Sequence, residues 1–246
     1  MSSLYENLAG VYDIMYQSFN NYDDEYKFYS SIFHHYNKRR IVEIGCGTGN
    51  LAQRFIENHY HYVGVDLSSD MLQFAQFKNK DGLFLKADMR RFTLSQPAEA
   101  CLMAGRTISY LQSDEDVYAC FSSVFKQLQN DGIFCFDFID AFRFIPTIND
   151  GKEIIHQASF ENRNYKRSSF WKVNYKSCFT FSWRAMYYEL KKDNNEEFLG
   201  KDDSVIRAFT KDDITLFLKL CGFHVLQIID KPSYAFDTYA VVAQKS

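Results

Sequence analysis

The stretch VEIGCGTGN, residues 42–50, decides the fold of this chain. It begins as a short apolar strand, passes through a glycine-rich loop and opens a helical stretch that runs to about Asn58. The glycines of the loop are Gly45, Gly47 and Gly49. Glycine lets the backbone turn sharply and lets a ligand approach with no Cβ in the way. The N–H groups at a helix N-terminus are free to bind that ligand. The stretch therefore predicts a strand–loop–helix unit that binds a ligand through its backbone.

Acidic residues mark the ends of three predicted strands. Glu43 lies two residues before the first glycine, Asp66 ends the strand HYVGVD (61–66), and Asp88 follows the strand at 83–87. The carboxyl ends of neighbouring parallel strands meet at one edge of a sheet, where open α/β folds bind their ligands. Asp66, 21 residues after the first glycine, is in the position that binds the two hydroxyls of a ribose.

Strands and helices alternate along most of the chain. The predicted strands are 41–44, 61–66, 83–87, 100–104, 132–138, 223–229 and 238–244. The last two helices, 113–130 and 210–221, each begin with a capping-box pattern, Ser113 with Asp116 and Thr210 with Asp213. This order predicts an α/β fold of the Rossmann-like kind, with a mostly parallel seven-stranded sheet flanked by helices.

The segment 141–209 interrupts this rhythm before the last helix and strands. Its centre alternates with period 2, which predicts a half-buried antiparallel sheet. The side chains expected on the buried face are Trp171, Val173, Tyr175, Phe179, Phe181, Trp183, Ala185 and Tyr187. We therefore expect one domain, 1–246, with an N-terminal helical cap at 1–38 and an antiparallel β lid at 141–209.

Composition limits the classes of function. The net charge is -3, which does not favour nucleic acid, and 46% of the residues are apolar, enough for a sizeable core. The N-terminus lacks the features of a secretory signal, and no apolar run approaches the ~18 residues of a membrane span. The six cysteines contain no C-x-x-C pair, so no metal site is predicted. We expect a cytoplasmic protein with no membrane partner and leave a homodimer open.

The insertion carries a local excess of basic residues. Between 161 and 192 eight Lys or Arg stand against two Glu, a local charge of 8 − 2 = +6. One interpretation is the solvated face of the antiparallel sheet, because most of the charges have the opposite parity to the aromatic residues. The other is an anionic acceptor, or single-stranded RNA stacked on the aromatic residues. We favour the solvated face.

Three segments together resemble a known superfamily. VEIGCGTGN (42–50), VDLSSDML (65–72) and KADMRRF (86–92) match the class I S-adenosylmethionine-dependent methyltransferases in type, order and spacing. The chain is most similar to their small-molecule branch, which includes methyltransferases of types 11 and 25 and sugar N,N-dimethyltransferases. The resemblance covers about 5–140 and 205–246, and YDIMY (12–16) matches an N-terminal motif of this branch.

The resemblance implies a cofactor, S-adenosylmethionine, with S-adenosylhomocysteine as product. It implies direct in-line methyl transfer to nitrogen or oxygen of a small-molecule acceptor. Asp66 would bind the ribose, with Leu67, Asp88 and Met89 around the adenine, while Tyr12 and Tyr16 would cover the cofactor. The complete set of predicted cofactor contacts is Tyr12, Tyr16, Glu43, Gly45, Cys46, Gly47, Asn50, Asp66, Leu67, Met71, Asp88, Met89, Ala104 and Gly105.

No catalytic side chain follows from the sequence. An amine acceptor only has to arrive unprotonated, whereas a hydroxyl acceptor would need a base. Weak candidates for a role at the acceptor are Tyr16, Arg106, Tyr110 and His156, and the histidines His34, His35, His59 and His61 are expected to be solvated. The chain departs from its relatives at Glu99, where an aspartate is usual, and at Arg106, which follows the fourth strand.

Two other functions remain open. A nicotinamide-dependent oxidoreductase also needs a glycine loop and a ribose-binding acid, but its G-x-G-x-x-G fingerprint fails at Asn50. A domain that binds the cofactor without catalysis, as an interaction module, would also carry these motifs.

Overall fold

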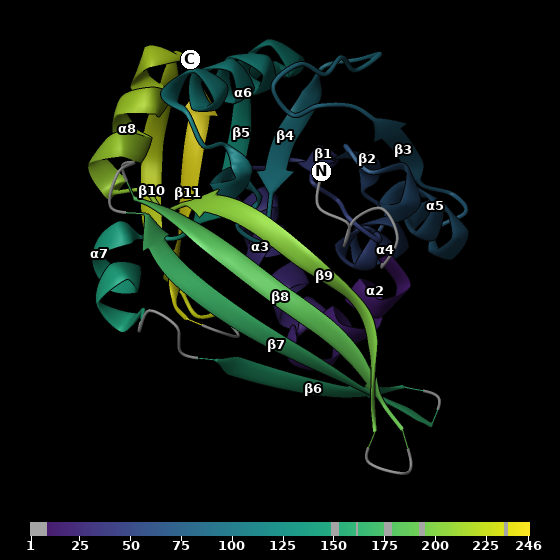
Figure 1. The fold of residues 1–246 in the computed structure, drawn as a ribbon. Helices are drawn as coiled ribbons and strands as arrows, with labels where there is room; N and C mark the ends of the chain where they lie inside the picture. The colour runs from purple at the N-terminus through teal and green to yellow at the C-terminus, as the bar shows by residue number, and fades with distance from the viewer. Residues whose placement is uncertain (1–8, 149–152, 161, 175–178, 192–194, 234–235) are drawn as a thin grey trace.

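A seven-stranded sheet forms the framework of the computed structural model, which describes residues 9–148, 153–160, 162–174, 179–191, 195–233 and 236–246. Its strands lie in the order β10-β11-β5-β4-β1-β2-β3 (Figure 1). They are β1 (Arg40–Ile44), β2 (His61–Asp66), β3 (Leu83–Lys86), β4 (Ala98–Met103), β5 (Leu128–Phe138), β10 (Phe223–Lys231) and β11 (Thr238–Lys245). Strands β1 to β5 run parallel, and β11 is antiparallel to both β5 and β10. The predicted mostly parallel seven-stranded sheet is confirmed.

Helices cover both faces of this sheet. They are α2 (Ala9–Phe19), α3 (Tyr22–His35), α4 (Asn50–Glu57), α5 (Ser69–Lys78), α6 (Asp114–Gln127), α7 (Ala141–Phe144) and α8 (Lys211–Leu220), with short 3-10 turns η1 (Thr107–Tyr110) and η2 (Ile145–Thr147). Helices α3 and α4 pack on a core that contains Ile133 and Cys135 of β5. Helices α6 and α8 pack on a core that contains Phe134 and Phe136. Successive side chains of a strand point to opposite faces, so the two cores lie on opposite sides of the sheet. None of the described helices is long and apolar enough to span a bilayer.

A second sheet of four antiparallel strands follows β5. Its strands are β6 (Ile154–Phe160), β7 (Arg163–Asn174), β8 (Thr180–Leu190) and β9 (Glu196–Arg207), and they pair in chain order. Figure 1 shows these long strands as a separate layer that slopes past α2. Met15 of α2 is fully buried against this sheet, in a cluster with Trp183 and Tyr187. The sheet and α2 are therefore packed together as one unit beside the main sheet.

The buried face of the second sheet follows the predicted alternation, with two exceptions. Phe181, Trp183, Ala185 and Tyr187 are buried, and Trp171 and Val173 are partly buried. Phe179 lies in a turn and is 37% exposed, contrary to the prediction, because it precedes the first residue of β8. Arg167 shares the parity of Trp171 and is buried, although the basic residues as a group were assigned to the solvated face. Tyr175 lies outside the described residues.

Several predicted boundaries shift by one or two residues, and the largest correction lies between α6 and β5. The helix predicted for 113–130 ends at Gln127, and the strand predicted to begin at Gly132 begins at Leu128. Leu128 contributes to the core as a strand residue, paired with Ala98 of β4. Its apolar side chain fits the helical period equally well, so the sequence pattern alone could not decide whether Leu128 ends the helix or begins the strand.

Only one of the two predicted capping boxes closes fully. At α8 the Thr210 hydroxyl accepts from the backbone of Asp213, whose carboxylate accepts from the Thr210 N–H. At α6 the Ser113 hydroxyl accepts from the backbone of Asp116. The Asp116 carboxylate instead forms an ion pair with Arg90, which brings α6 beside the segment after β3.

Candidate functional site

The glycine loop sits between β1 and α4 with its backbone in conformations that favour glycine. Gly45, Gly47 and Gly49 have φ values of 71°, 53° and 75°. A Cβ added at Gly45 would lie 2.6 Å from Thr107 Cγ2, so close packing excludes a side chain there. A Cβ at Gly47 would meet nothing within 4 Å, because this glycine faces open space. The first glycine thus packs against the protein, and the second presents its backbone to a cleft.

Asp66, at the end of β2, holds the loops on both sides of it. Its carboxylate accepts from the Gly47 N–H at 2.9 Å and from the Ser68 N–H at 2.9 Å. Burial raises the pKa of this carboxyl group, and the backbone N–H groups oppose that rise. The acid predicted to bind a ribose therefore also fastens the glycine loop to the start of α5.

Asp88 is paired within its own segment. Arg90 contacts both carboxylate oxygens, with its Nη2 2.6 Å from Oδ2, and also reaches Asp116 on α6. The guanidinium holds the pKa of Asp88 below its usual range. The Asp88 carbonyl accepts from the Arg91 N–H in a turn. Asp88 is thus an ionised, fixed carboxylate at the rim of the cleft.

Glu43 is a buried acid whose pKa is raised above the usual range of a carboxyl group. Its side chain is 4% exposed and accepts a 2.6 Å hydrogen bond from the Tyr62 hydroxyl. Burial, together with the negative charge of Asp66, raises its pKa to about 8, although the hydrogen bond from Tyr62 opposes this. At neutral pH the carboxyl group is mostly protonated, so the burial of a charge is avoided.

We predict that Glu43→Gln flattens the pH dependence of stability. A carboxyl group whose pKa is raised on folding stabilises the fold below its unfolded pKa, and this contribution is lost as pH rises towards the folded pKa of about 8. The free energy of unfolding of the wild type should therefore fall relative to Glu43→Gln by roughly 2 kcal/mol between pH 6.0 and 7.5, at about 1.4 kcal/mol per pH unit. Urea unfolding at several pH values measures this difference. Parallel pH curves for the two proteins would contradict the prediction.

Helix α2 lies over the glycine loop and is tied to it by Asp13. The Asp13 carboxylate accepts from Thr48 Oγ1 at 2.5 Å, from Asn50 Nδ2 at 2.8 Å and from Lys78 Nζ at 2.7 Å. The side-chain oxygen of Asn50, Oδ1, in turn accepts from Lys78 Nζ at 2.6 Å. The Asn50 side chain, predicted as a cofactor contact, is thus engaged in holding α2, α4 and α5 together.

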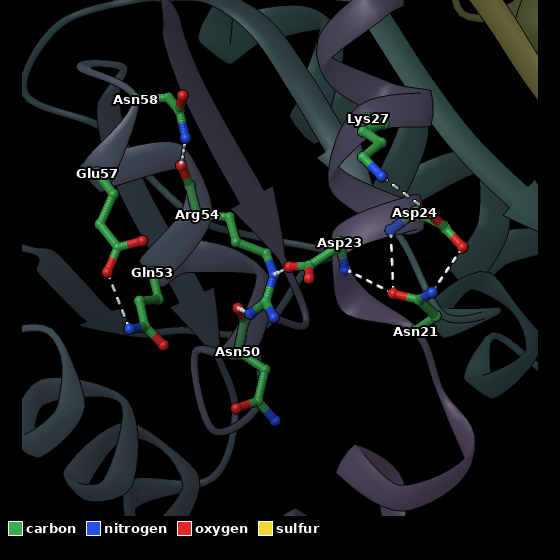
Figure 2. A network of polar contacts seen from close by, with 9 residues as sticks. All are labelled: Asn21, Asp23, Asp24, Lys27, Asn50, Gln53, Arg54, Glu57 and Asn58. Atoms are coloured by element: carbon green, nitrogen blue, oxygen red, sulfur yellow. Dashed lines mark hydrogen bonds and ion pairs between the residues drawn. The ribbon is translucent and has the colours of Figure 1, made fainter.

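The adjoining helix α3 is tied to α4 at the same end of the molecule. Figure 2 shows Arg54 of α4 between Asp23 of α3 and the backbone of Asn50, with hydrogen bonds of 2.6 and 2.9 Å. Asn21 caps α3 by accepting from the backbone of Asp23 and Asp24. These contacts fix the N-terminal helices relative to the glycine loop.

The strand ends, α2 and the second sheet enclose a cleft of about 840 Å³. A smaller hollow of about 100 Å³ adjoins it beneath the glycine loop and shares Gly45, Gly47 and Gly105 with it. Ten predicted cofactor residues line the cleft: Tyr12, Tyr16, Gly45, Gly47, Asp66, Leu67, Met71, Asp88, Met89 and Gly105. The other four line the hollow: Glu43, Cys46, Asn50 and Ala104. The structure thus brings the predicted set together, and the individual roles stay predictions.

The four weak catalytic candidates, Tyr16, Arg106, Tyr110 and His156, also line the cleft. Tyr16 stacks on Tyr12 with ring centroids 4.0 Å apart. Nδ1 of His156 lies 3.1 Å from Nη2 of Arg167. A guanidinium has only donors, so this Nδ1 is the acceptor and Nε2 carries the hydrogen of the neutral ring. Burial and the Arg167 charge lower the pKa of His156 to about 4, which argues against its use as a base.

The unusual Arg106 is held by the protein itself. Its N–H donates to Asp137 Oδ1 at 2.9 Å, and its guanidinium donates to Ser233 Oγ at 2.6 Å. The guanidinium also lies 4.3 Å from the ring centroid of Phe236. The other departure, Glu99, accepts backbone hydrogen bonds from residues 39 and 40, just before and at the start of β1. Glu99 thus holds the N-terminal end of β1, which is the end opposite to the glycine loop.

The sequence interpretation missed a buried ion cluster beside the hollow. Lys231 of β10 is 4% exposed and lies 2.6 Å from Glu25 of α3 and 3.4 Å from Asp137 of β5. Asp137 could have been found, because it is another acid near a strand end. Nothing in the sequence marks Lys231 as buried. Asp13 lies inside the YDIMY motif, but the sequence interpretation assigned roles only to the tyrosines of that motif.

Several sequence expectations concern residues outside the cleft. His34, His35, His59 and His61 are exposed, as predicted. Cys46, Cys101, Cys120 and Cys135 are buried free thiols, and Cys221 is partly buried. Within the described residues, no group of three or more His, Cys, Asp or Glu side chains is arranged to hold a metal ion.

Comparisons with known proteins agree with this geometry. A family model described as a methyltransferase domain matches residues 41–132. The putative methyltransferase YqeM of Bacillus subtilis is 28% identical over 261 residues, which cover 99% of this chain and 98% of that protein. Both matches agree with the expected resemblance to the class I S-adenosylmethionine-dependent methyltransferases.

Two further proteins that are similar to this chain have names that say they act on amino sugars. The dTDP-3-amino-3,4,6-trideoxy-alpha-D-glucopyranose N,N-dimethyltransferase of Streptomyces venezuelae is 27% identical over 111 residues, covering 45% of this chain and 46% of that one. The structure of CalS10, an amino pentose methyltransferase from Micromonospora echinaspora, superposes with a TM-score of 0.81 at 17% identity, covering 96% and 97% of the two chains. This second likeness shows a shared fold.

The sheet order also separates this fold from the alternative oxidoreductase class. The dinucleotide-binding sheet has the order 3-2-1-4-5-6. Here the last strand of the chain, β11, is inserted antiparallel between β5 and β10. Together with the failed fingerprint at Asn50, this arrangement disfavours a nicotinamide-dependent enzyme.

Proposed function

We propose that this chain transfers a methyl group from S-adenosylmethionine directly to nitrogen or oxygen of a small-molecule acceptor. One observation carries the proposal: a single cleft joins the glycine loop and Asp66 to an aromatic wall on the second sheet that includes Trp171 and Trp183. Its volume of about 840 Å³ is within the range of small-molecule sites, roughly 300–1,000 Å³. The cleft therefore has room for a cofactor and for an acceptor beside it.

The residues at the glycine-loop end fit this cofactor. Gly47 and Gly105 both have positive φ, and a Cβ at either would meet nothing within 4 Å, so their backbone borders open space that could hold part of a ligand. Both oxygens of the Asp66 carboxylate accept backbone N–H groups, and the carboxylate keeps acceptor capacity for a ribose hydroxyl. Leu67 and Met89 line the same cleft, which supports a role for both in packing against the adenine.

The proposed division of roles follows the cleft. Asp66 binds the ribose hydroxyls, and Asp88 with the apolar Leu67, Met71 and Met89 surrounds the adenine. The backbone of the glycine loop, with Cys46, Ala104 and Gly105, faces the amino acid end of the cofactor. Glu43 and Asn50 support this end from below, and Tyr12 with Tyr16 forms the roof. We propose that residues 1–38 and 141–209 act as cap and lid, since α2 and the second sheet line the cleft.

The cofactor supplies an activated methyl group on a sulfonium, and the chain supplies orientation. Correct alignment of two reactants can contribute roughly 7–11 kcal/mol in favourable cases. The tautomer imposed on His156 by Arg167 disfavours this ring as a base. An amine acceptor needs no base once it is unprotonated, so the site favours nitrogen. The N,N-dimethyltransferase from Streptomyces venezuelae also acts on an amine.

Calorimetry tests the cofactor first. We expect S-adenosylmethionine and S-adenosylhomocysteine to bind with micromolar affinity, and NAD not to bind. Binding of NAD alone would overturn the proposal in favour of an oxidoreductase. A panel of small amines and hydroxyl compounds then tests turnover by mass spectrometry, and a gain of about 14 Da identifies a methylated product. Cofactor binding with no turnover on any acceptor would favour the non-catalytic interaction module.

A further inference from the structure

Arg167 differs from the other basic residues of the second sheet in its burial. Residues 161–192 contain eight Lys or Arg, and the structure describes six of them. Of these six, Arg167 alone is buried, with 4% of its surface exposed. The other five are Arg163, Lys166, Lys172, Arg184 and Lys191. Several of these pair with acids on neighbouring strands, for example Lys166 with Glu196. Arg167 contacts His156 and also lines the cleft.

The position of Arg167 follows from the strand period. Ser169 and Trp171, two and four residues further along β7, also line the cleft. The guanidinium lies 5.4 Å from the ring centroid of Tyr16 and 4.8 Å from that of Phe19, both on α2. Packing between aromatic faces restricts an arginine to few rotamers and reduces its hydration. The charge is therefore held in place before any acceptor binds.

His156 extends this positive group into the cleft as a second donor. Its Nδ1 accepts from the guanidinium at 3.1 Å, which leaves the hydrogen of the neutral ring on Nε2. Burial and the neighbouring charge lower the pKa of His156 to about 4, so the ring is neutral at physiological pH and keeps this tautomer. Arg167 and His156 thus present N–H donors, and neither is suited to act as a base.

Two indole rings line the same cleft as this pair. Trp171 and Trp183 stack on each other with ring centroids 5.7 Å apart, and both line the same cleft. The acid of the second sheet that lines the cleft, Asp203, is paired with Arg184 and Lys201. A fixed guanidinium and an N–H donor beside two indole rings suit an oxyanion attached to an apolar or planar body.

We infer that Arg167 and His156 bind an oxyanion of the methyl acceptor, a carboxylate or a phosphate, while Trp171 and Trp183 pack against its apolar part. This inference rests on the proposed function, because it places the acceptor in the same cleft as the cofactor. It assigns specificity to one buried arginine and not to the surface charge of the insertion.

Binding of small probes to the protein saturated with S-adenosylhomocysteine tests the inference. The probes are 4-aminobenzoate and phenyl phosphate, with neutral 4-aminobenzamide as the isostere, and the readouts are calorimetry and tryptophan fluorescence. We expect at least one anionic probe to bind at least tenfold more tightly than the amide. Tighter binding of phenyl phosphate would identify a phosphate acceptor, and tighter binding of 4-aminobenzoate a carboxylate. Equal affinities, or no binding of either anion at millimolar concentration, would overturn the inference.

Variants assign the preference to Arg167. Arg167→Met, which keeps much of the side-chain volume, is expected to abolish the preference for the anion, and Arg167→Lys to retain part of it. Lys172→Met, an exposed change on the same strand, is the matched control and should bind as the wild type does. Retention of the full preference in Arg167→Met would contradict the assignment. Failure of the wild type to bind S-adenosylhomocysteine would instead count against the proposed function.

Discussion

Replacing Asp66 with alanine is expected to weaken the binding of S-adenosylmethionine at least tenfold, and roughly 100-fold if bonds to both ribose hydroxyls are lost. A hydrogen bond to a charged group contributes about 1.5–3 kcal/mol, and each 1.4 kcal/mol corresponds to about a factor of ten in affinity. The variant also removes the acceptor of the Gly47 and Ser68 N–H groups. The glycine loop should then lose part of its order, which adds to the loss of affinity.

Asp66→Asn separates these two contributions. The amide oxygen can still accept one backbone hydrogen bond, but the negative charge is gone. We expect its affinity for S-adenosylhomocysteine to lie between those of the wild type and Asp66→Ala. Asp81→Asn, an exposed change just before β3, is the matched control and should leave affinity unchanged. Calorimetry measures the affinities, and thermal melting confirms that each variant is folded. Wild-type affinity in a folded Asp66→Ala protein would refute the assignment of this residue.

Local patterns carried most of what could be predicted about the fold. The run of apolar residues into Gly45 predicted β1 and its loop, because glycine at positive φ and an apolar strand are both local features. The acids at strand ends were predicted to meet because parallel strands place their carboxyl ends at one edge, and Asp66 and Asp88 do line one cleft. Such inferences need only the order of the elements and the parallel sheet.

Partners distant in sequence could not be predicted in this way. Lys231 and Glu25 are 206 positions apart, and their contact depends on how β10 lies relative to α3. The pairing of Arg90 with both Asp88 and Asp116 requires α6 to lie beside the segment after β3. Strand β5 begins early because β4 offers a pairing partner, which no local pattern reports.

Arg167 is an intermediate case. Its position in the strand alternation predicted an inward-facing side chain, but the net charge of the whole insertion hid this prediction. It has the parity of Trp171 in β7, so the alternation that turns the tryptophan towards the inner face also predicts an inward-facing arginine. Counting charge over the whole insertion combined this residue with exposed ones such as Lys172 and Arg184. A charged residue on the apolar parity of a strand is more informative than the net charge of the segment.

Replacing Lys231 with methionine is expected to destabilise the fold by roughly 3–5 kcal/mol. Lys231 is 4% exposed, and its removal leaves the carboxylates of Glu25 and Asp137 close together without their shared counter-charge. Removing one partner of a buried ion pair has a cost of this size because the remaining charge is uncompensated. In a domain of this length the melting temperature should fall by roughly 6–20 °C. Lys219→Met, an exposed change on α8, should have little effect.

The double variant Lys231→Met with Asp137→Asn tests the reason for this loss. Asparagine keeps the oxygen that accepts the Arg106 N–H but removes the uncompensated charge. We therefore expect the double variant to be more stable than Lys231→Met alone, although it carries one more substitution. Urea unfolding of the wild type, Lys231→Met, Asp137→Asn and the double variant gives the coupling energy between positions 231 and 137. Losses that simply add would show that Lys231 stabilises the fold independently of Asp137, for example through its contacts with the rings of Phe28 and Tyr29. The same ion cluster borders the hollow proposed for the amino acid end of the cofactor, so affinity for S-adenosylhomocysteine should recover in the double variant only as far as the fold does.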